Sequence, residues 1–418
     1  MTYLKSWVDT ANSASTDFPL NNLPYGVFSI GGQAPRCGVA IGNQVLDVAA
    51  VESLGLLSIG ESSLCQQAAW NPLMALGQKS WAAFRDQLTA LLSEGASEQT
   101  QLQAHLYPLA DVQMHMPFTV TEFTDFYAGK HHATNVGTMF RGAENALPPN
   151  WLHIPIGYNG RASSVVVSGT DVQRPWGQLK GPDQELPAFM PSRRFDLELE
   201  MGAIVGPASN GPVSVDEADA MIFGYVLLND WSARDIQAWE YQPLGPFQAK
   251  ATATTISPWI VTATALESFR VDTPAREFEL LPHLKDTGPM LYDIKLSVTL
   301  APEGQTASTI ANTNYSEMYY SAAQQLAHHS TSGCPMRTGD LLGSGTISGP
   351  EKDMRGSMLE LSWGGKEPMT LDTGETRSFL EDGDTLTLHG HAQGDGFRIG
   401  FGDCAGTLVP ALDNPYAR

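Results

Sequence analysis

The sequence predicts a mainly β fold with some α-helix, arranged as a mixed β-roll or sandwich. Its 418 residues include 40 Gly and 27 Pro, which favours many turns over a helical bundle. Short apolar or alternating runs follow one another without regular helices between them, which argues against a doubly wound parallel sheet. A chain of this length can form two or three domains with a substantial core.

The overall charge argues against two kinds of partner. The chain has 24 basic and 45 acidic residues, and its formal net charge of -21 would repel nucleic acid and anionic membranes. The four cysteines are scattered without a C-x-x-C spacing, which indicates free thiols in a reducing compartment. The N-terminus lacks a signal-peptide pattern, and no apolar run is long enough to span a membrane. We therefore predict a cytoplasmic protein.

The N-terminal part is predicted to form a small domain. Residues 25–51 alternate short apolar runs with Gly and Pro, which predicts twisted hairpins. Residues 79–94 place their large apolar side chains on one side, which predicts an amphipathic helix. Met116 and Pro117 mark a boundary, so we predict domains over residues 1–117 and 118–418.

The second domain carries a denser series of strand patterns. The predicted strands cover residues 163–169, 195–205, 292–301, 356–363 and 384–391. Helical patterns are fewer, and they occur after His132, after Asp230 and around residues 314–329.

The most informative stretch is residues 229–250, NDWSARDIQAWEYQPLGPFQAK. It follows an apolar run that predicts a buried strand, and Asn229 or Asp230 is a suitable N-cap for a following helix. On that helix one stripe would present an acid, a guanidinium, an amide and a phenol: Asp230, Arg234, Gln237 and Tyr241. A polar helix face with an ion pair explains the same pattern equally well.

Residues 195–200, FDLELE, form the second informative stretch. In a strand Asp196, Glu198 and Glu200 share one face, where they either converge on a cation or lie on the solvent face of an edge strand. Glu198 and Glu200, together with Asp125 and Asp230, supply only oxygen ligands, which suits Mg²⁺ or Ca²⁺ rather than zinc. The motifs of serine hydrolases, NTPases and dinucleotide-binding enzymes are absent from the sequence.

A histidine and a glutamate complete the set of candidates. His131 and His132 precede a predicted helix that reaches Arg141, and either is a candidate general base or a structural residue. Glu360 lies in the apolar run 356–363, GSMLELSW, which we interpret as a strand. A carboxylate there needs a partner unless it lies on a wet face, and a histidine would serve.

Several of these segments together resemble the fumarylacetoacetate hydrolase family. The similar segments are TDFY, HATNVG, PPNWLHIPIGYNGRASS, DLELEM, NDWSARDIQAWEY, TTISPW, GTISG and GDGFRIGFGDCAG, and the resemblance runs from about Tyr25 to Leu408. It implies a small SH3-like N-terminal barrel, a mixed β-roll C-terminal domain and a homodimer. It also implies metal-dependent hydrolysis of the carbon–carbon bond of 4-fumarylacetoacetate to fumarate and acetoacetate, the last step of tyrosine and phenylalanine breakdown.

The resemblance also implies roles for particular residues. The metal would be held by Asp125, Glu198, Glu200 and Asp230, with Lys250 and Thr254 at a second, magnesium-type position. The base would be His132, oriented by Glu360, and the oxyanion donors would be Arg234, Gln237 and Lys250. The substrate contacts would be Tyr127, Arg141, Tyr158, Gln237, Tyr241 and Thr346. The resident ion would be Mg²⁺ or Ca²⁺, with Mn²⁺ as a third candidate.

Two departures from the family pattern accompany this resemblance. Ala249 and Ala253 stand where the family usually has glycines, and either would be strained if its φ must be positive. His131 precedes His132, and we choose His132 because it carries the match to HATNVG. The alternative functions are a related acylpyruvate hydrolase, an oxo-acid decarboxylase or isomerase, and, in a different class, a non-catalytic metal-binding protein.

Overall fold

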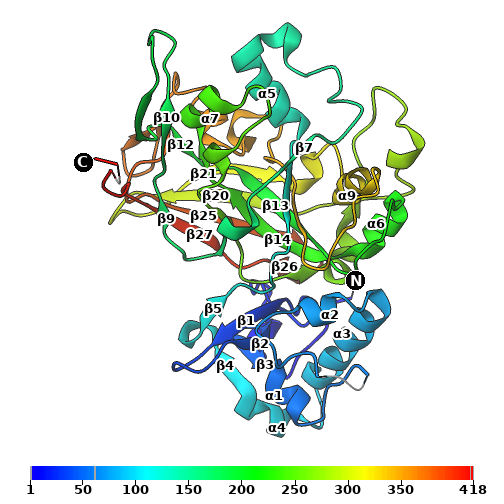
Figure 1. The fold of residues 1–418 in the computed structure, drawn as a ribbon. Helices are drawn as coiled ribbons and strands as arrows, with labels where there is room; N and C mark the ends of the chain where they lie inside the picture. Colours follow the sequence, from blue (N-terminus) through cyan, green and yellow to red (C-terminus); the bar gives the residue numbers. More distant parts are fainter. Residues whose placement is uncertain (1, 61–62, 415, 418) are drawn as a thin grey trace.

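The predicted fold class, mainly β with some α, is confirmed. The computed structural model describes residues 2–60, 63–414 and 416–417, so the outer limits of the two predicted domains, residues 1 and 418, lie outside the described residues. Figure 1 shows a five-stranded sheet and its helices at the bottom, with the larger sheets above them. Among the described residues, none of the helices combines the length and the apolar character needed to cross a bilayer.

The N-terminal sheet is antiparallel and has the strand order β4-β3-β2-β1-β5, which curves as a half-barrel. Its strands are β1 (Tyr25–Ser29), β2 (Arg36–Ile41), β3 (Gln44–Asp47), β4 (Leu106–Pro108) and β5 (Gln113–His115). Four helices accompany it: α1 (Val48–Ser53), α2 (Asn71–Met74), α3 (Gln78–Leu92) and α4 (Gln99–Leu102). The helix predicted over residues 79–94 is α3, and its buried residues include Trp81, Phe84 and Leu88 at helical spacing.

The central sheet of the larger part is mixed and has eight strands, in the order β7-β6-β22-β13-β14-β16-β8 with β17 paired to β14. In chain order these are β6 (Phe123–Phe126), β7 (Gly157–Asn159), β8 (Val165–Val167), β13 (Leu199–Val205), β14 (Ile222–Asp230), β16 (Thr254–Ile256), β17 (Val261–Thr262) and β22 (Leu341–Gly343). Strands far apart in the sequence meet here, since β22 pairs with both β6 and β13.

A second large sheet packs beside it with the order β21-β20-β25-β27-β9 and β26 paired to β25. Its strands are β9 (Val172–Gln173), β20 (Lys295–Ala301), β21 (Ser308–Asn314), β25 (Thr385–Gln393), β26 (Arg398–Gly400) and β27 (Cys404–Val409). Four short pairs complete the strands: β10 (Trp176–Leu179) with β11 (Ala188–Pro191), β12 (Phe195–Asp196) with β15 (Ser232–Ala233), β18 (Arg270–Val271) with β19 (Leu291–Tyr292), and β23 (Met369–Thr370) with β24 (Thr376–Arg377).

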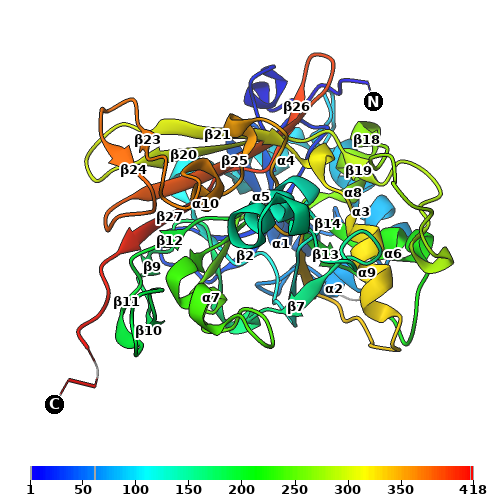
Figure 2. The same ribbon diagram turned by 90° about the horizontal axis from the view of Figure 1, so that it is seen from above.

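The helices of the larger part are short. They are α5 (Lys130–Arg141), α6 (Val215–Met221), α7 (Arg234–Glu240), α8 (Ala263–Leu266), α9 (Ala322–Ser330) and α10 (Met358–Leu361). In Figure 1, α5 and α7 lie at the top, on the side away from the N-terminal sheet. Figure 2 looks down on this side, with α5 near the centre and α7 and β7 close to it.

Several predicted elements differ from the structure, including the helix predicted around residues 314–329, which begins only at Ala322. The run 356–363 is not a strand, because Ser357 caps a short helix by accepting a bond from the Glu360 amide and α10 follows. The helix after Asp230 begins only at Arg234, since Trp231 and Ala233 are buried and residues 232–233 pair with β12. Residues 195–200 are not one strand but two, β12 and β13, with Leu197 and Glu198 between them.

The two faces of the central sheet contact different cores. From β13 and β14, side chains such as Met201 and Leu227 join the core of the larger part. The opposite face, with Ile204, Phe223 and Leu228, joins the core of the N-terminal part. Apolar surface is therefore buried continuously between the two parts, which holds the central sheet from below.

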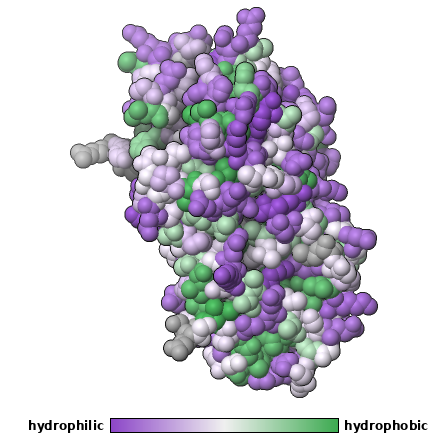
Figure 3. Space-filling model, turned by 90° about the vertical axis from the view of Figure 1, so that its right-hand side faces the viewer, coloured by the Kyte–Doolittle hydropathy of each residue, from purple (hydrophilic) through white to green (hydrophobic). Residues whose placement is uncertain are grey.

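One face of the molecule is mostly polar. Figure 3 shows one face that is largely hydrophilic, with hydrophobic residues gathered in separate patches over the N-terminal part. This distribution fits a chain with a formal net charge of -21.

The contact between the two parts gives a testable prediction. The Phe223 ring lies 5.7 Å from the Tyr25 ring and 5.0 Å from the Trp81 ring, so it bridges the parts. Phe223→Ala should lower the free energy of unfolding by about 3–5 kcal/mol, because it removes a buried ring and leaves a cavity. Urea unfolding measures this loss. Phe278→Ala, at a ring that is 51% exposed, is the control and should cost less than about 1 kcal/mol.

Candidate active site

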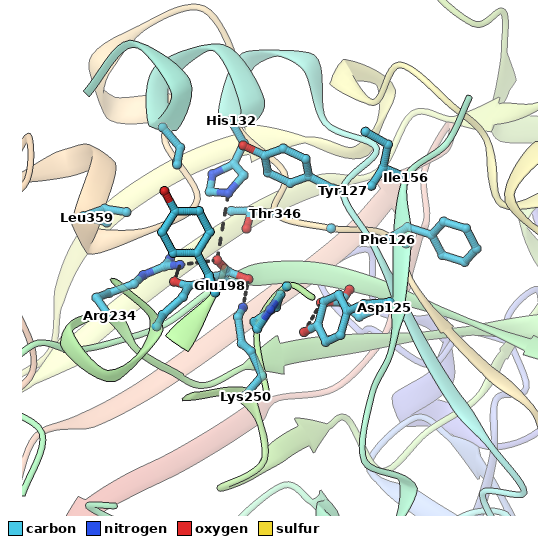
Figure 4. A pocket seen from close by; sticks show the side chains of 18 of the residues that line it. Asp125, Phe126, Tyr127, His132, Ile156, Glu198, Arg234, Lys250, Thr346 and Leu359 are labelled. Atoms are coloured by element: carbon cyan, nitrogen blue, oxygen red, sulfur yellow. Dashed lines mark hydrogen bonds and ion pairs between the residues drawn. The ribbon is translucent and has the colours of Figure 1, made fainter. Parts of the chain in front are cut away.

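The candidate site lies at the end of the central sheet, beneath α5 and α7. A cavity of about 360 Å³ opens there between β6, β7, α5, α7 and the loop that follows α7. Figure 4 shows Glu198 near the centre of this cavity, with His132, Arg234 and Lys250 turned toward it. Most of the site residues implied by the family resemblance line the cavity: Asp125, Tyr127, His132, Arg141, Tyr158, Glu198, Arg234, Gln237, Tyr241, Lys250 and Thr346.

Four carboxylates meet at the floor of the cavity. One oxygen each from Asp125, Glu198, Glu200 and Asp230 lies within 4.8 Å of the others, and all four residues are buried. We call these four residues the carboxylate cluster. Asp125 belongs to β6, Glu200 to β13 and Asp230 to the last position of β14. Strand β22 pairs with β6 on one side and with β13 on the other. Asp125 and Glu200, which are far apart in sequence, therefore converge at the same end of the sheet.

A glycine makes room for this convergence. Gly343 on β22 pairs with Asp125 on one side and with Gly202 on the other. A Cβ at position 343 would lie 2.7 Å from Asp125 Oδ1 and 3.0 Å from Glu200 Oε2. Any side chain here would therefore occupy the space in which the carboxylates gather.

The carboxylate cluster fits a hard divalent cation. Within the described residues, Asp125 Oδ1, Glu200 Oε1, Asp230 Oδ1 and Thr254 Oγ1 are buried without a hydrogen-bond partner. Buried oxygens of this kind are costly unless something satisfies them, and an all-oxygen donor set is the one that Mg²⁺ and Ca²⁺ prefer. The cluster therefore has the donor chemistry of a divalent-metal site.

Burial and mutual repulsion act on the carboxylates of this cluster. Burial, followed by repulsion from Asp230, raises the pKa of Asp125 well above its ordinary value. Burial, followed by the charge of Asp125, also raises the pKa of Glu200 well above its ordinary value. Burial alone would also raise the pKa of Glu198, but Lys250 and Arg234 outweigh it and hold that pKa well below its usual range.

Two cations of the protein meet the cluster at Glu198. Arg234 Nη1 lies 2.7 Å from Glu198 Oε1, and Lys250 Nζ donates to Glu198 Oε2 and to Asp230 Oδ2 at 2.6 Å. Arg234 Nη1 also donates to Gln237 Oε1 at 3.2 Å, while its Nη2 is buried without a partner within the described part of the chain. The guanidinium therefore keeps one donor available for a group that enters the cavity.

His132 and Glu360 form a buried pair beside the cluster. His132 Nδ1 lies 2.6 Å from Glu360 Oε2, and the other ring nitrogen, Nε2, lies 3.9 Å from Glu198 Oε1. Burial alone would raise the pKa of Glu360, but His132 and the hydrogen bonds to this carboxylate lower it below its ordinary value. An ionised Glu360 would accept a hydrogen bond from Nδ1–H, which would leave Nε2 as the acceptor of a neutral ring.

The structure separates the two neighbouring histidines. The helix α5 begins at Lys130 and so includes both, contrary to the prediction that they precede it. Successive helical residues point about 100° apart, and only His132 is buried. The His131 side chain is 39% exposed, with its Nε2 3.5 Å from Glu317 Oε2.

Glu360 has further hydrogen-bond donors that the sequence did not identify. Asn135 Nδ2 donates to Oε1 at 2.9 Å, and the hydroxyls of Ser348 and Ser357 donate to Oε2 at 3.0 and 2.7 Å. The spacing S-x-x-E at residues 357–360 is a helix-start signal that would have predicted both α10 and this contact.

Asp196, the first acid of the FDLELE stretch, lies outside the carboxylate cluster. Asp196 accepts a bond from Arg234 Nε at 2.8 Å instead of facing the cavity. The predicted shared face of Asp196, Glu198 and Glu200 is therefore wrong for Asp196, because β12 ends at that residue.

The remaining candidates lie around the rest of the cavity. Tyr158 donates from its hydroxyl to Asp125 Oδ2 at 2.8 Å, and Thr346 has a buried Oγ1 without a partner among the described residues. Arg141 donates from Nε and Nη2 to the carbonyls of Asn145 and Ala146, at 3.1 and 2.6 Å. Tyr241, at 41% exposure, lies at the mouth of the cavity.

The two alanines that replace family glycines are accommodated. Neither Ala249 nor Ala253 has a positive φ, and both are buried. The strain that a positive φ would impose on them is therefore absent. Lys250 and Thr254, which follow these alanines, are buried at the same end of the sheet.

Comparisons with known proteins agree with this geometry. Residues 121–409 match the family model described as "Fumarylacetoacetate (FAA) hydrolase C-terminal", and residues 21–117 match "Fumarylacetoacetase N-terminal". The fumarylacetoacetases of Bos taurus and Homo sapiens are each 50% identical over 407 residues, covering 95% of this chain and 97% of the relative. The fumarylacetoacetase of Arabidopsis thaliana is 46% identical over 422 residues, covering 98% of this chain and 100% of the relative.

Solved structures share the fold at low sequence identity. The fumarylacetoacetate hydrolase of Exiguobacterium antarcticum has a TM-score of 0.53 at 15% identity, covering 93% of this chain and 100% of its own. A 2-hydroxyhepta-2,4-diene-1,7-dioate isomerase of Mycobacterium marinum has a TM-score of 0.50 at 16% identity, covering 93% and 98%. The fold thus occurs with more than one activity. The two family models and the near-full-length relatives show that this chain belongs to the fumarylacetoacetate hydrolase family.

Proposed function

We propose that this chain hydrolyses the carbon–carbon bond of 4-fumarylacetoacetate to give fumarate and acetoacetate, the last step of tyrosine and phenylalanine breakdown. The observation that carries the proposal is the buried His132–Glu360 pair, 2.6 Å apart, next to the carboxylate cluster. Relatives named for this activity are about 50% identical over 95% of the chain, which favours it over an acylpyruvate hydrolase, decarboxylase or isomerase.

The carboxylate cluster would hold the divalent cation. We infer Mg²⁺ or Ca²⁺ there, with Mn²⁺ as a third candidate, and Lys250 and Thr254 at a second position beside it. A bound divalent cation supplies a Lewis acid that polarises the diketone and stabilises the enolate that departs.

His132 would take a proton from water at Nε2. Glu360 fixes the tautomer through Nδ1, so Nε2 is free to accept. The resulting hydroxide adds to the carbonyl carbon, the bond to the acetoacetate fragment breaks, and that fragment finally gains the proton on carbon. Fumarate keeps the oxygen from water.

The cationic groups beside Glu198 would stabilise the negative charge that develops on the carbonyl oxygen. Arg234 contributes its unpartnered Nη2, with Gln237 and Lys250 as further donors. Burial alone would lower the pKa of Lys250, but Asp230 and Glu198 raise it, so the side chain remains an ammonium at neutral pH.

Other residues that line the cavity would bind the rest of the substrate. Arg141 has the planar, charged donors that suit a terminal carboxylate of a diacid. Tyr127, Tyr158, Tyr241 and Thr346 would complete the contacts around the carbon chain. Tyr127 also packs edge-on against the His132 ring, with 5.5 Å between the ring centroids. One proposed substrate contact therefore packs directly on the proposed base.

Three further proposals concern the whole molecule. A division near residue 117 into two domains is supported by the N-terminal sheet, which is complete by residue 115. A cytoplasmic location is supported by Cys37, Cys65, Cys334 and Cys404, which are all free thiols. A homodimer is proposed from the family resemblance.

The paired histidines provide a matched test of the base. His132→Ala should lower kcat for 4-fumarylacetoacetate by about 10²–10⁴-fold, because it removes the proton acceptor. His131→Ala should keep near-normal kcat, since its side chain lies outside the cavity lining. A spectrophotometric assay of substrate loss compares the two. Undiminished turnover by His132→Ala would remove this residue as the base.

Cation binding should stabilise the protein more strongly as pH rises. The raised pKa values of Asp125 and Glu200 mean that the metal-free folded chain holds more protons than the unfolded chain above ordinary carboxyl pKa values. Its free energy of unfolding therefore falls with rising pH. A cation replaces those protons, so the Tm difference between loaded and EDTA-treated protein should widen between about pH 5 and about pH 8.

The size and specificity of this effect can be measured by thermal unfolding. At 100 times its Kd a cation adds about 2.7 kcal/mol. Glu200→Gln should lose most of the gain, whereas Asp340→Asn, a buried acid outside the carboxylate cluster, should keep it. A wild-type Tm that does not respond to Mg²⁺, Ca²⁺ or Mn²⁺ would rule the cation site out.

Arg141 gives a test of the substrate class. Arg141→Gln should raise KM for 4-fumarylacetoacetate by about 10–100-fold with little change in kcat, because a charged hydrogen bond worth about 1.5–3 kcal/mol is lost. An acylpyruvate without a second carboxylate should show a much smaller change. Arg161→Gln, at an exposed arginine outside the cavity, is the control. Equal KM effects on both substrates would contradict the diacid assignment.

A further inference from the structure

Asp196 is a fully buried acid that the proposed reaction leaves without a role. Its Oδ1 accepts bonds from the backbone N–H groups of Leu197 and Met358, both at 2.8 Å. Its Oδ2 accepts bonds from the Leu359 N–H at 3.0 Å and from Arg234 Nε at 2.8 Å. Each oxygen therefore has two donors, and those donors come from separate segments of the chain.

These donors connect the two sides of the active site. The amides of Met358 and Leu359 open α10, the short helix that carries Glu360 and through it orients His132. Arg234 is the first residue of α7, and its Nη1 lies 2.7 Å from Glu198 Oε1. Asp196 itself does not line the cavity, but it joins the segment that holds the base to the guanidinium that faces the substrate.

The donor pattern is more specific than an ion pair would require. A buried ion pair usually adds little net stability, because desolvating both charges offsets their attraction. Asp196 divides its four bonds between Arg234 and the backbone, including both leading amides of α10. Asp196 therefore connects the start of α7, at Arg234, to the start of α10, at Met358 and Leu359.

We propose that Asp196 is a positioning residue that holds α10, and with it Glu360 and His132, at a fixed distance from Arg234. This inference rests on the proposed function, since it concerns the same site. In the proposed hydrolysis His132 must contact the attacking water while Arg234 donates to the carbonyl oxygen. A displacement of about 1 Å between two such groups can cost about 100-fold in rate.

Asp196→Asn is the direct test. The amide keeps the shape and one acceptor oxygen, but it loses the charge and cannot accept all four bonds. We expect kcat for 4-fumarylacetoacetate to fall about 10–100-fold, as is typical when a partner behind a catalytic group is removed. KM should change less than about threefold, because Arg141, Tyr158 and Tyr241 are untouched.

A second buried acid provides a matched control. Asp384 accepts from Arg377 Nε and from the Glu381 N–H, both at 2.9 Å, and it is 1% exposed. It lies outside the cavity lining. Asp384→Asn should therefore lower Tm while leaving kcat unchanged. Equal falls in kcat in the two variants, or a normal kcat in Asp196→Asn, would overturn the positioning role.

Asp196→Glu keeps the test decisive if the asparagine variant does not fold. It retains the charge of the pair but adds one methylene, which displaces α10 from Arg234. A folded Asp196→Glu with wild-type kcat would overturn the proposal, and a fall in kcat with a near-normal KM would support it. Wild-type turnover is measured first. Its absence would overturn the proposed function itself, whereas a normal wild type with an unaffected Asp196 variant overturns only the positioning role.

Discussion

Buried negative charge must be compensated, and in this protein the compensation meets at Glu198. Four carboxylates lie together, and within the described residues only Glu198 contacts two cations, Arg234 and Lys250. Asp125 and Glu200 lie farther from those cations and keep unpartnered oxygens within the described structure. The site is thus divided into a part that the protein neutralises itself and a part with the donor chemistry for a metal ion.

The arrangement of strands and helices places the carboxylates and the His132–Glu360 pair on different sides of the site. Strand β22 lies between β6 and β13, and its Gly343 leaves the space that the acids need. On the other side α5 and α10 bring His132 against Glu360, so that one ring nitrogen is fixed and the other faces the cavity. Strands carry three of the four carboxylates, and the helices α5 and α10 carry the groups that would move protons.

The chemistry of the site was easier to predict than its geometry. Strand alternation drew attention to the acids of DLELE, and helical spacing drew attention to Asp230. The apolar run around Glu360 predicted that this carboxylate needs a partner, but only the family resemblance identified His132 as that partner. The contact between Asp196 and Arg234 could not be predicted from the local sequence. Strand β12 ends at Asp196, and its length depends on pairing with β15, which lies far away in the chain. The strand predicted around Glu360 was wrong because a serine cap overrode the apolar pattern. Strand order joins distant segments, and local periodicity carries no information about it.

The two-sided burial of the central sheet also bears on synthesis. During synthesis the strands of the half-barrel emerge before Phe223, Val226 and Leu228, which belong to the same core. Those residues belong to β14, which leaves the ribosome only after β6, β8 and β13. Until β14 has been synthesised, the apolar side chains of the N-terminal part that pack against it therefore lack their cover.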